Sequence, residues 1–544
     1  MTGLPEDGRQ EAAADPRPRR EVAIVPAAAR GHLRELLRAL EEAYPVRFVD
    51  GPTADVRALV VLPGGTPPAH PGVPCLVYSG AGEEAPGAEF EMRMSRFAGL
   101  HRALRGQCLS ERGRRAPAAL TVAAGAEVLA VAAGRPVWVR EADGTETVSG
   151  APAELGPGEF LRDHLRAGRF WALLPLIELL RRVCADRSQA PAPIRACFIL
   201  DDPNLRFSSY GYLSYPALAR DAREHGYHLA IATIPLDLLL PGRRGAAVFR
   251  DHPGQLSLVV HGNDHVHREL GRSRGREGAD RLARAALARV GRFERRAGVR
   301  VERVMCPPHG ACSAEMLAAL FRHGFGGLAA SRPFPWDGFA GHGDWRLGGW
   351  LPAQMAGGGL PVISRYPLAW SLDDVVFRAL LGQPVVLYGH QSDLRDGLEP
   401  LRAAAARVAT LGEVEWTSLA AIARTNAVVR EHDGEATVTV YSRDVRLPRP
   451  AGGRVRVEIP RRFGDPGPVQ VTVDDDVRAV DTGSTGGAVG AFPQNGRGDL
   501  RIRLDPPEPP ASATLADWRP RAWPLARRAM TEARDRALPL LRRP

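Results

Sequence analysis

"CFILDDPNLR", residues Cys197–Arg206, decides the predicted fold, because an apolar run ends there directly on two carboxylates. The run is typical of a buried strand, where the like charges of Asp201 and Asp202 would repel and lose their hydration. A divalent cation would offset the charge of one carboxylate and leave the other free to act as a base. The structural alternative is a turn or helix cap with Pro203 and Asn204, since Asp, Pro and Asn favour both.

Three further apolar runs end on residues that chemistry uses. The run "LSLVV" precedes "HGNDHVH" at His261–His267, "VERVM" precedes "CPPHG" at Cys306–Gly310, and "PVVLY" precedes "GHQSD" at Gly389–Asp393. In a barrel of parallel strands, the loops that follow the strands open on one face. We therefore expect these four segments to converge although they lie far apart in the sequence.

The spacing of His261 and His265 adds a second argument for a metal site. If a helix follows the strand, residues four apart project from one side of it. Two imidazoles and the carboxylate of Asp202 would then form a facial triad with open positions for water and substrate. Asp264 is predicted either to orient one imidazole through its free N–H or to face solvent.

The remaining candidates each have two interpretations. Asn204 either contacts substrate or satisfies the turn backbone, and His309 with Gly310 either lines the pocket or forms a turn. His390 follows a buried run and is expected to be exposed at its end. Asp393 or Asp396 could hydrogen-bond the imidazole of His390, select one tautomer and raise its pKa.

Composition excludes several classes of protein. The 544 residues suggest roughly three or four domains. All 72 basic residues are arginine, which excludes lysine Schiff-base chemistry and a lysine-bearing phosphate loop. The arginines are mixed with 62 acidic residues, so no nucleic-acid partner is expected despite the formal charge of +10. No run is long and apolar enough for a membrane helix, no secretory signal is visible, and the six scattered cysteines fit a reducing cytoplasm.

Pattern changes along the chain predict six segments. The β/α alternation predicts two α/β units, and the later period-two alternation predicts an antiparallel β domain resembling a sandwich. The basic, helix-like tail could contact an acidic partner or a membrane surface. The segments are 1–20 (disordered), 21–140 (small α/β domain), 141–194 (helical connector and linker), 195–425 (β/α barrel), 426–510 (β domain) and 511–544 (basic helical tail).

The motifs of 195–425 resemble, in order, those of the NodB-like polysaccharide deacetylases, carbohydrate esterase family 4. The family motifs are a strand ending in Phe-Asp-Asp, then His-Ser/Thr-x-x-His, Arg-x-Pro-x-Gly and Leu-x-His. The corresponding text here is "ILDD", "HGNDH", "CPPHG" and "LYGH". The resemblance covers less than half of the chain and implies a distorted, incomplete (β/α) barrel.

The resemblance also implies roles for single residues. Asp201 would be the catalytic base, and Asp202, His261 and His265 would hold a divalent metal ion, zinc or a similar one. His390 would protonate the leaving amine. Two positions depart from the family pattern: Pro203 replaces a glycine, so the loop must take another path, and Cys306 replaces the arginine that orients the base.

We therefore expect a metal-dependent hydrolase that deacetylates an N-acetylated sugar or glycan-like substrate. The tetrahedral oxyanion would rest partly on a backbone N–H near His309 and Gly310. Two alternatives stay open. The first is a metal-dependent amidase or glycan hydrolase on the same barrel, and the second is a catalytically inactive carbohydrate-binding protein.

Overall fold

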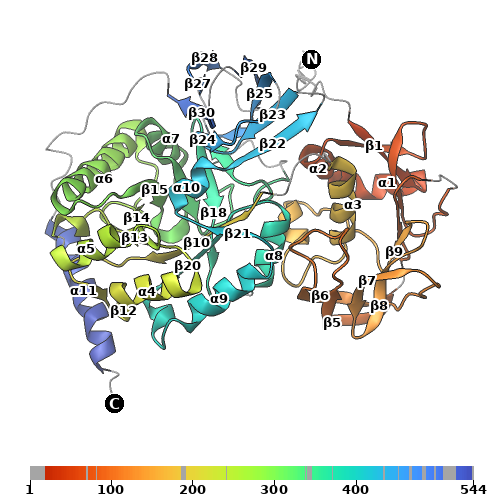
Figure 1. Cartoon of the computed structure of the whole chain (residues 1–544), viewed down its shortest axis with the longest axis horizontal. Coiled ribbons are helices and arrows are strands. Elements are labelled where there is room, and N and C mark those ends of the chain that lie inside the picture. Colours follow the sequence, from red (N-terminus) through yellow and green to blue (C-terminus); the bar gives the residue numbers. More distant parts are fainter. Residues whose placement is uncertain are drawn as a thin grey trace, which may run out of the picture.

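The computed structural model describes residues 19–68, 72–80, 82–185, 192–240, 242–336, 339, 346–369, 372–432, 435–450, 453–464, 468–480, 486–494, 498–506 and 522–541. Most of the segment predicted to be disordered, residues 1–18, lies outside this set. The described chain is mixed α/β with several sheets (Figure 1). None of its described helices is both long enough and apolar enough to cross a membrane.

The first sheet has nine strands and is half parallel, half antiparallel. Its order is β2-β1-β3-β4-β9-β8-β7-β5-β6, and the pairings from β2 to β9 are parallel. The antiparallel half includes a tight hairpin, in which Ala133 and Gly134 both take positive φ as a two-residue turn requires. The strands are β1 Arg20–Val25, β2 Val46–Asp50, β3 Val56–Val61, β4 Cys75–Tyr78, β5 Gly82–Met94, β6 Cys108–Pro117, β7 Glu127–Ala132, β8 Arg135–Arg140 and β9 Glu146–Val148.

The predicted helical connector is helical over only part of its length. Helix α3 spans Leu174–Cys184, preceded by a single 3-10 turn, η2, at Leu161–His164. Between them Gly168 takes a φ of 76°, and its amide donates to the carbonyl of Ser110. The segment between η2 and α3 therefore runs beside β6 instead of continuing as a helix. The other helices here are α1 Ala27–Arg30, η1 Gly31–Leu33 and α2 Arg34–Ala43.

The second sheet carries the predicted site. Its order is β19-β20-β10-β13-β14-β15-β16-β18-β17-β26, with β21 paired to β10. The described strands therefore follow an open path, and a closed barrel is not confirmed. The strands are β10 Ile194–Asp201, β13 Leu229–Thr233, β14 Leu256–His261, β15 Glu302–Cys306, β16 Gly327–Ala330, β17 Gln354–Ala356, β18 Leu360–Ser364, β19 Tyr366–Pro367, β20 Val385–His390, β21 Val414–Trp416 and β26 Arg462–Phe463.

Both faces of this sheet are buried, as expected for parallel strands with helical crossovers. Phe198 and Leu200 of β10 belong to the large core, whereas Cys197 and Ile199 belong to a smaller cluster completed by residues of α10. The helices and 3-10 turns of this region are α4 Tyr215–His225, η3 Asp237–Leu239, α5 Arg243–Asp251, α6 Gly275–Ala297, η4 Pro308–Gly310, α7 Ala314–Arg322, α8 Asp373–Leu380, η5 Gln391–Leu394, α9 Glu399–Ala409 and α10 Leu419–Arg424. A two-stranded ribbon, β11 Ser209–Tyr210 and β12 Leu213–Ser214, precedes α4.

Two four-stranded sheets follow, in the orders β22-β23-β25-β29 and β24-β30-β27-β28. The pairings are antiparallel except that of β23 with β25, which is parallel. Helix α11, Ala522–Leu541, lies apart from these strands, at the edge of the second sheet's region (Figure 1). The strands are β22 Ala427–His432, β23 Glu435–Val440, β24 Asp444–Leu447, β25 Arg454–Ile459, β27 Val469–Val473, β28 Asp476–Val480, β29 Gly487–Pro493 and β30 Leu500–Asp505.

Candidate metal centre

Four strands of the second sheet end on the residues that the sequence singled out. Asp201, His261, Cys306 and His390 are the last residues of β10, β14, β15 and β20. Asp201 is in register with His390, and His261 is in register with Cys306. Because side chains alternate along a strand, each of the four shares a face with the residue two positions earlier. Those earlier residues are Ile199, Val259, Val304 and Tyr388, and all four are in or against the smaller core cluster.

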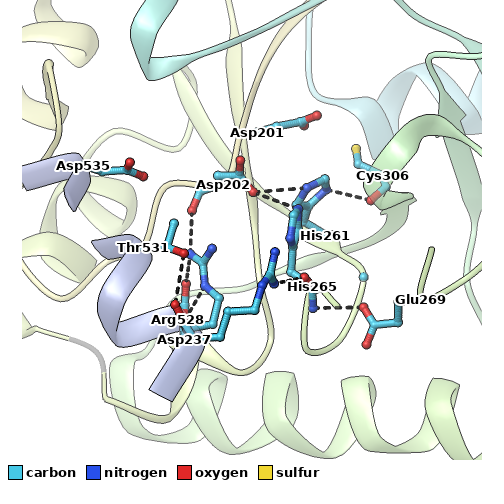
Figure 2. A network of polar contacts seen from close by, with 12 residues as sticks. Asp201, Asp202, Asp237, His261, His265, Glu269, Cys306, Arg528, Thr531 and Asp535 are labelled. Atoms are coloured by element: carbon cyan, nitrogen blue, oxygen red, sulfur yellow. Dashed lines mark hydrogen bonds and ion pairs between the residues drawn. The ribbon is translucent and has the colours of Figure 1, made fainter. Parts of the chain in front are cut away.

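Asp202, His261 and His265 converge just beyond this edge (Figure 2). The Oδ1 atom of Asp202 lies 3.5 Å from Nε2 of His261 and 3.2 Å from Nε2 of His265. One ligand atom from each residue lies within 4.8 Å of the other two. The His261 side chain is 3 % exposed, while those of His265 and Asp202 are 16 % and 28 % exposed, so solvent reaches the group on the side of Asp202 and His265.

The histidine pair is held by a loop, not by the helix that the spacing suggested. The chain from Gly262 to His267 has no helical turn. The carboxylate of Glu269, itself 1 % exposed, accepts hydrogen bonds from the backbone amides of Asn263, Asp264 and His265 at 2.7–3.0 Å. These bonds replace the internal bonding of a helix and fix the loop that carries His265. Glu269 was not identified from the sequence, where it follows the motif as an ordinary acidic residue.

The orientation of His261 comes from the backbone. Its Nδ1 atom lies 2.8 Å from the carbonyl oxygen of Cys306, which leaves Nε2 facing Asp202. Asp264, the predicted partner of an imidazole, instead forms an ion pair with the buried Arg289, which also donates to Asn263. Nδ1 of His265 is buried without a hydrogen-bond partner among the described residues.

Asp201 is bound by an arginine that the sequence analysis missed. The guanidinium of Arg365 donates to both carboxylate oxygens of Asp201, at 2.6 and 2.8 Å. Both residues are 3 % exposed. Arg365 follows β18 directly, two positions after Ile363, which belongs to the same face of the sheet. An arginine thus supplies the contact expected of position 306, but from another strand.

The charges of the group set its protonation. Burial alone would raise the pKa of Asp201, but Arg365 and His261 together outweigh burial and keep that pKa below its usual range. Burial acts in the same way on Asp202, where His261 and His265 keep the pKa well below normal. Burial and the neighbouring His261 lower the pKa of His265 to about 4, so its imidazole is neutral at pH 7. Burial also opposes the charge on His261, but the two aspartates raise its pKa.

Backbone strain is concentrated at this group. Six described residues other than glycine have a positive φ, and four of them lie in the loops around the site. Such conformations cost about 1–3 kcal/mol each and persist where the surroundings impose them. Asp202, at φ 82°, turns the chain sharply before Pro203. The other three are His265 at 55°, Arg268 at 49° and His309 at 62°.

The neighbouring candidates behave mainly as parts of turns. The Oδ1 atom of Asn204 accepts from the amide of Arg206 at 3.2 Å, whereas its Nδ2 atom is buried with no partner in the part of the chain that the structure describes. His309 is exposed, and its ring centroid lies 6.0 Å from that of His265. The amide of Gly310 donates to the carbonyl of Pro307 at 3.0 Å, so it is already engaged.

His390 lies at the same edge as Asp201 but outside the convergent group. Its side chain is exposed, and its ring lies 6.3 Å from the ring of Tyr388. The carboxylate of Asp393 accepts a hydrogen bond from the backbone amide of His390 at 2.8 Å, so Asp393 anchors the main chain of the strand end.

Helix α11 contacts the group from the open side (Figure 2). Arg528 pairs with Asp237 at 2.6 Å, and its guanidinium lies 3.5 Å from the carbonyl oxygen of Asp202. Arg527 donates to the carbonyl of His265. The sequence analysis treated this helix as a separate tail, because nothing in its pattern links it to residues some 300 positions earlier.

Comparison with known proteins leaves the family open. No family model matches the chain, and no curated protein matches it. Among solved structures, a family 4 carbohydrate esterase from Streptomyces lividans in complex with acetate is 13% identical, with a TM-score of 0.24 over 41% of this chain and 88% of that one. The Xyl-CE4 domain of a multidomain xylanase from the hindgut metagenome of Trinervitermes trinervoides is 10% identical, with a TM-score of 0.25 over 42% and 90%.

An aldolase from Escherichia coli K12 has a similar TM-score, 0.21. It is 12% identical, and the match covers 40% of this chain and 87% of the aldolase. Likenesses this weak carry no argument about activity. The case for a function therefore depends on the side chains of this chain.

We expect Arg365→Leu to destabilise the protein by about 3–5 kcal/mol at neutral pH, because it leaves the carboxylate of Asp201 buried and unpaired. The pair depresses the pKa of Asp201 in the folded protein. Its contribution to stability is therefore complete above the ordinary value of 3.8 and is lost as the pH falls through the depressed value. In the variant, burial without Arg365 raises the pKa of Asp201, so acidification relieves the buried charge. The cost of the substitution should shrink as the pH falls from neutral to below 3.8.

Urea denaturation of the two proteins at several pH values measures this difference. Arg112→Leu is the matched control, because Arg112 pairs with Glu89 on the surface with 69 % of its side chain exposed. Its removal should cost under about 1 kcal/mol. Equal costs for the two substitutions, or a cost independent of pH, would contradict the proposed role of the pair.

Proposed function

We propose that the chain is a metal-dependent hydrolase that removes an acetyl group from an N-acetylated sugar or glycan-like substrate. The observation that carries this proposal is the convergence of one carboxylate and two imidazoles beside a second, buried carboxylate. Asp202, His261 and His265 would bind a divalent metal ion, and Asp201 would serve as the base. The motif order of the resembled family agrees with this assignment but is not needed for it.

The three side chains fit a divalent ion. Zinc binds imidazole nitrogen and carboxylate oxygen at about 2.0–2.2 Å, which places tetrahedral ligands roughly 3.3–3.6 Å apart. The two distances from Asp202 to the imidazoles, 3.5 and 3.2 Å, are close to this range. Among the described residues the Oδ1 atom of Asp202 is buried without a hydrogen-bond donor, and a metal would satisfy it.

A bound divalent ion would supply Lewis-acid activation of a water molecule at neutral pH. Asp201 would accept the proton of that water, and its ion pair with Arg365 keeps it ionised and therefore able to do so. The same pair fixes the carboxylate in one orientation and weakens it as a base. The neutral imidazole of His265 can offer a lone pair without first losing a proton.

His390 would donate a proton to the leaving amine. It lies beside Asp201 across the β10–β20 pairing, and its imidazole is exposed where a substrate could reach it. Asp393 would help by fixing the main chain of His390, whose amide it binds. Asn204, with an unsatisfied buried amide nitrogen, and His309, next to His265, would line the substrate pocket.

A second candidate function is a carbohydrate-binding protein without turnover. Helix α11 favours it, because Arg527 and Arg528 contact the backbone of the residues that would bind the metal. A substrate would have to enter beside this helix or displace it. An amidase or glycan hydrolase on the same residues would differ from the first proposal only in its substrate.

We expect the purified protein to bind zinc, and Asp202→Ala or His261→Ala to weaken binding by more than about 100-fold. Loss of a direct ligand should exceed the roughly 10–100-fold cost of losing an outer partner. Isothermal titration with elemental analysis measures this. His267→Ala is the control, because His267 is an exposed imidazole in the same loop that is not one of the three convergent residues. Unchanged affinity in His261→Ala would refute the metal site.

We expect acetate release from N-acetylated amino sugars to exceed that from simple acetamides, with no cleavage of aryl glycosides. Asp201→Asn should lower kcat by about 10²–10⁴-fold, because the substitution removes the proton acceptor. It also removes the ion pair with Arg365, so zinc content and thermal unfolding of the variant are measured alongside kcat. Zinc binding without acetate release from any of these substrates would favour the binding protein instead.

A further inference from the structure

Helix α11 is turned with its charged side toward the protein. Arg528, Glu532 and Asp535 recur at helical spacing, and each is 5 % exposed. Each of these buried side chains has a partner in the region before α5. The pairs are Arg528 with Asp237 at 2.6 Å, Glu532 with Arg206 at 3.0 Å, and Asp535 with the hydroxyl of Tyr210 at 2.7 Å.

The opposite side of the helix is apolar and faces outward. Trp523 is 66 % exposed and Met530 is 59 % exposed. Leu525, which is 42 % exposed, lies at the flank of the helix, about 60° from Arg528 at 3.6 residues per turn. Four exposed alanines continue the same side, at positions 526, 529, 533 and 537. A surface helix normally buries its apolar side against the core and exposes its charges. The reversed orientation of α11 leaves a whole apolar side in water unless something else covers it.

The apolar surface extends beyond the helix. Among the described residues seven large apolar side chains are exposed, and five of them lie on α11 or on the segments that it contacts. Besides the three on the helix, these are Phe207, which is 54 % exposed, and Leu240, which is 65 % exposed. Arg536 of α11 stacks on the ring of Phe207 at 4.4 Å. Leu240 directly follows η3, where Asp237 binds Arg528.

The exposed charge around this surface is positive. The two acidic residues of α11, Glu532 and Asp535, are both buried and paired. The side chain of Arg534 is 68 % exposed, and its guanidinium pairs with Asp535. Arg243 and Arg244 are exposed at the start of α5. The preceding residue, Gly242, donates its amide to Leu205, next to the segment that contacts α11.

We propose that the outward side of α11, with Phe207 and Leu240, docks on the surface of an anionic lipid bilayer. A helix that lies in the interface buries Trp, Leu and Met among the acyl chains, while flanking arginines bind anionic headgroups. The convex side of one helix, mostly alanine with a single tryptophan, fits a deformable lipid surface better than the concave pockets that anchor protein partners. Docking would hold the triad about one helix diameter, roughly 10 Å, from the membrane surface.

Co-sedimentation of the full chain with vesicles tests this proposal independently of any hydrolase activity. We expect binding to vesicles of phosphatidylcholine with one quarter phosphatidylglycerol, weaker binding to pure phosphatidylcholine, and loss of binding at high salt. Trp523→Glu and Met530→Glu should each weaken partitioning by at least about tenfold. The emission of Trp523, obtained as the difference from Trp523→Phe, should shift to shorter wavelength on binding.

Val477→Glu is the matched control, since Val477 is also 57 % exposed but lies on β28, away from α11. It should leave vesicle binding unchanged. Thermal unfolding of all variants shows whether each still folds. The proposal is overturned if the chain binds neither vesicle, if it binds both equally, or if Val477→Glu is as damaging as Met530→Glu. It is also overturned if Met530→Glu abolishes only self-association, measured by light scattering, because a second copy would then cover this side.

Discussion

The buried ion pair between Asp201 and Arg365 is the interaction on which the candidate site depends. It joins the end of β10, in the middle of the second sheet, to the residue that follows β18. Two charges at 3 % exposure are stabilised by two hydrogen bonds between opposite charges. The pair therefore fixes where the chain turns after the strand, and with it the position of Asp202.

The rest of the site follows from that turn and from one loop. Asp202 leaves the strand at a φ of 82°, which directs its carboxylate toward the histidines instead of along the sheet. The loop after β14 brings His265 to the same point, and Glu269 holds three of its amides. The carbonyl of Cys306 orients the first histidine from the adjacent strand. The strands and the loop bound by Glu269 hold the three side chains in place without a helix. A site whose side chains are fixed in this way is preorganised for a ligand.

Helix α11 links the candidate site to the outer surface. Its charged side is satisfied by residues around the site, so it remains attached through ion pairs even though its apolar side faces away. Arg528 and Arg527 of this helix contact the backbone carbonyls of Asp202 and His265 respectively. Whatever covers the outer side of the helix would thus lie close to the opening of the site.

The sequence by itself determined which residues could meet. Four apolar runs end on Asp201, His261, Cys306 and His390, and strands of the second sheet end at these residues. The pattern could be recognised in the sequence because the carboxyl ends of parallel strands share one edge of a sheet. That Asp202, His261 and His265 bind a metal stays a prediction. Only the tertiary structure decided the partners of these residues: Arg365 for Asp201, Glu269 for the loop, Arg289 for Asp264, and α11 for the open side. The physical reason is the separation in sequence over which each feature is determined. A strand end follows from local periodicity, whereas the arginine that neutralises a buried carboxylate can come from any part of the chain that packing brings within hydrogen-bond distance.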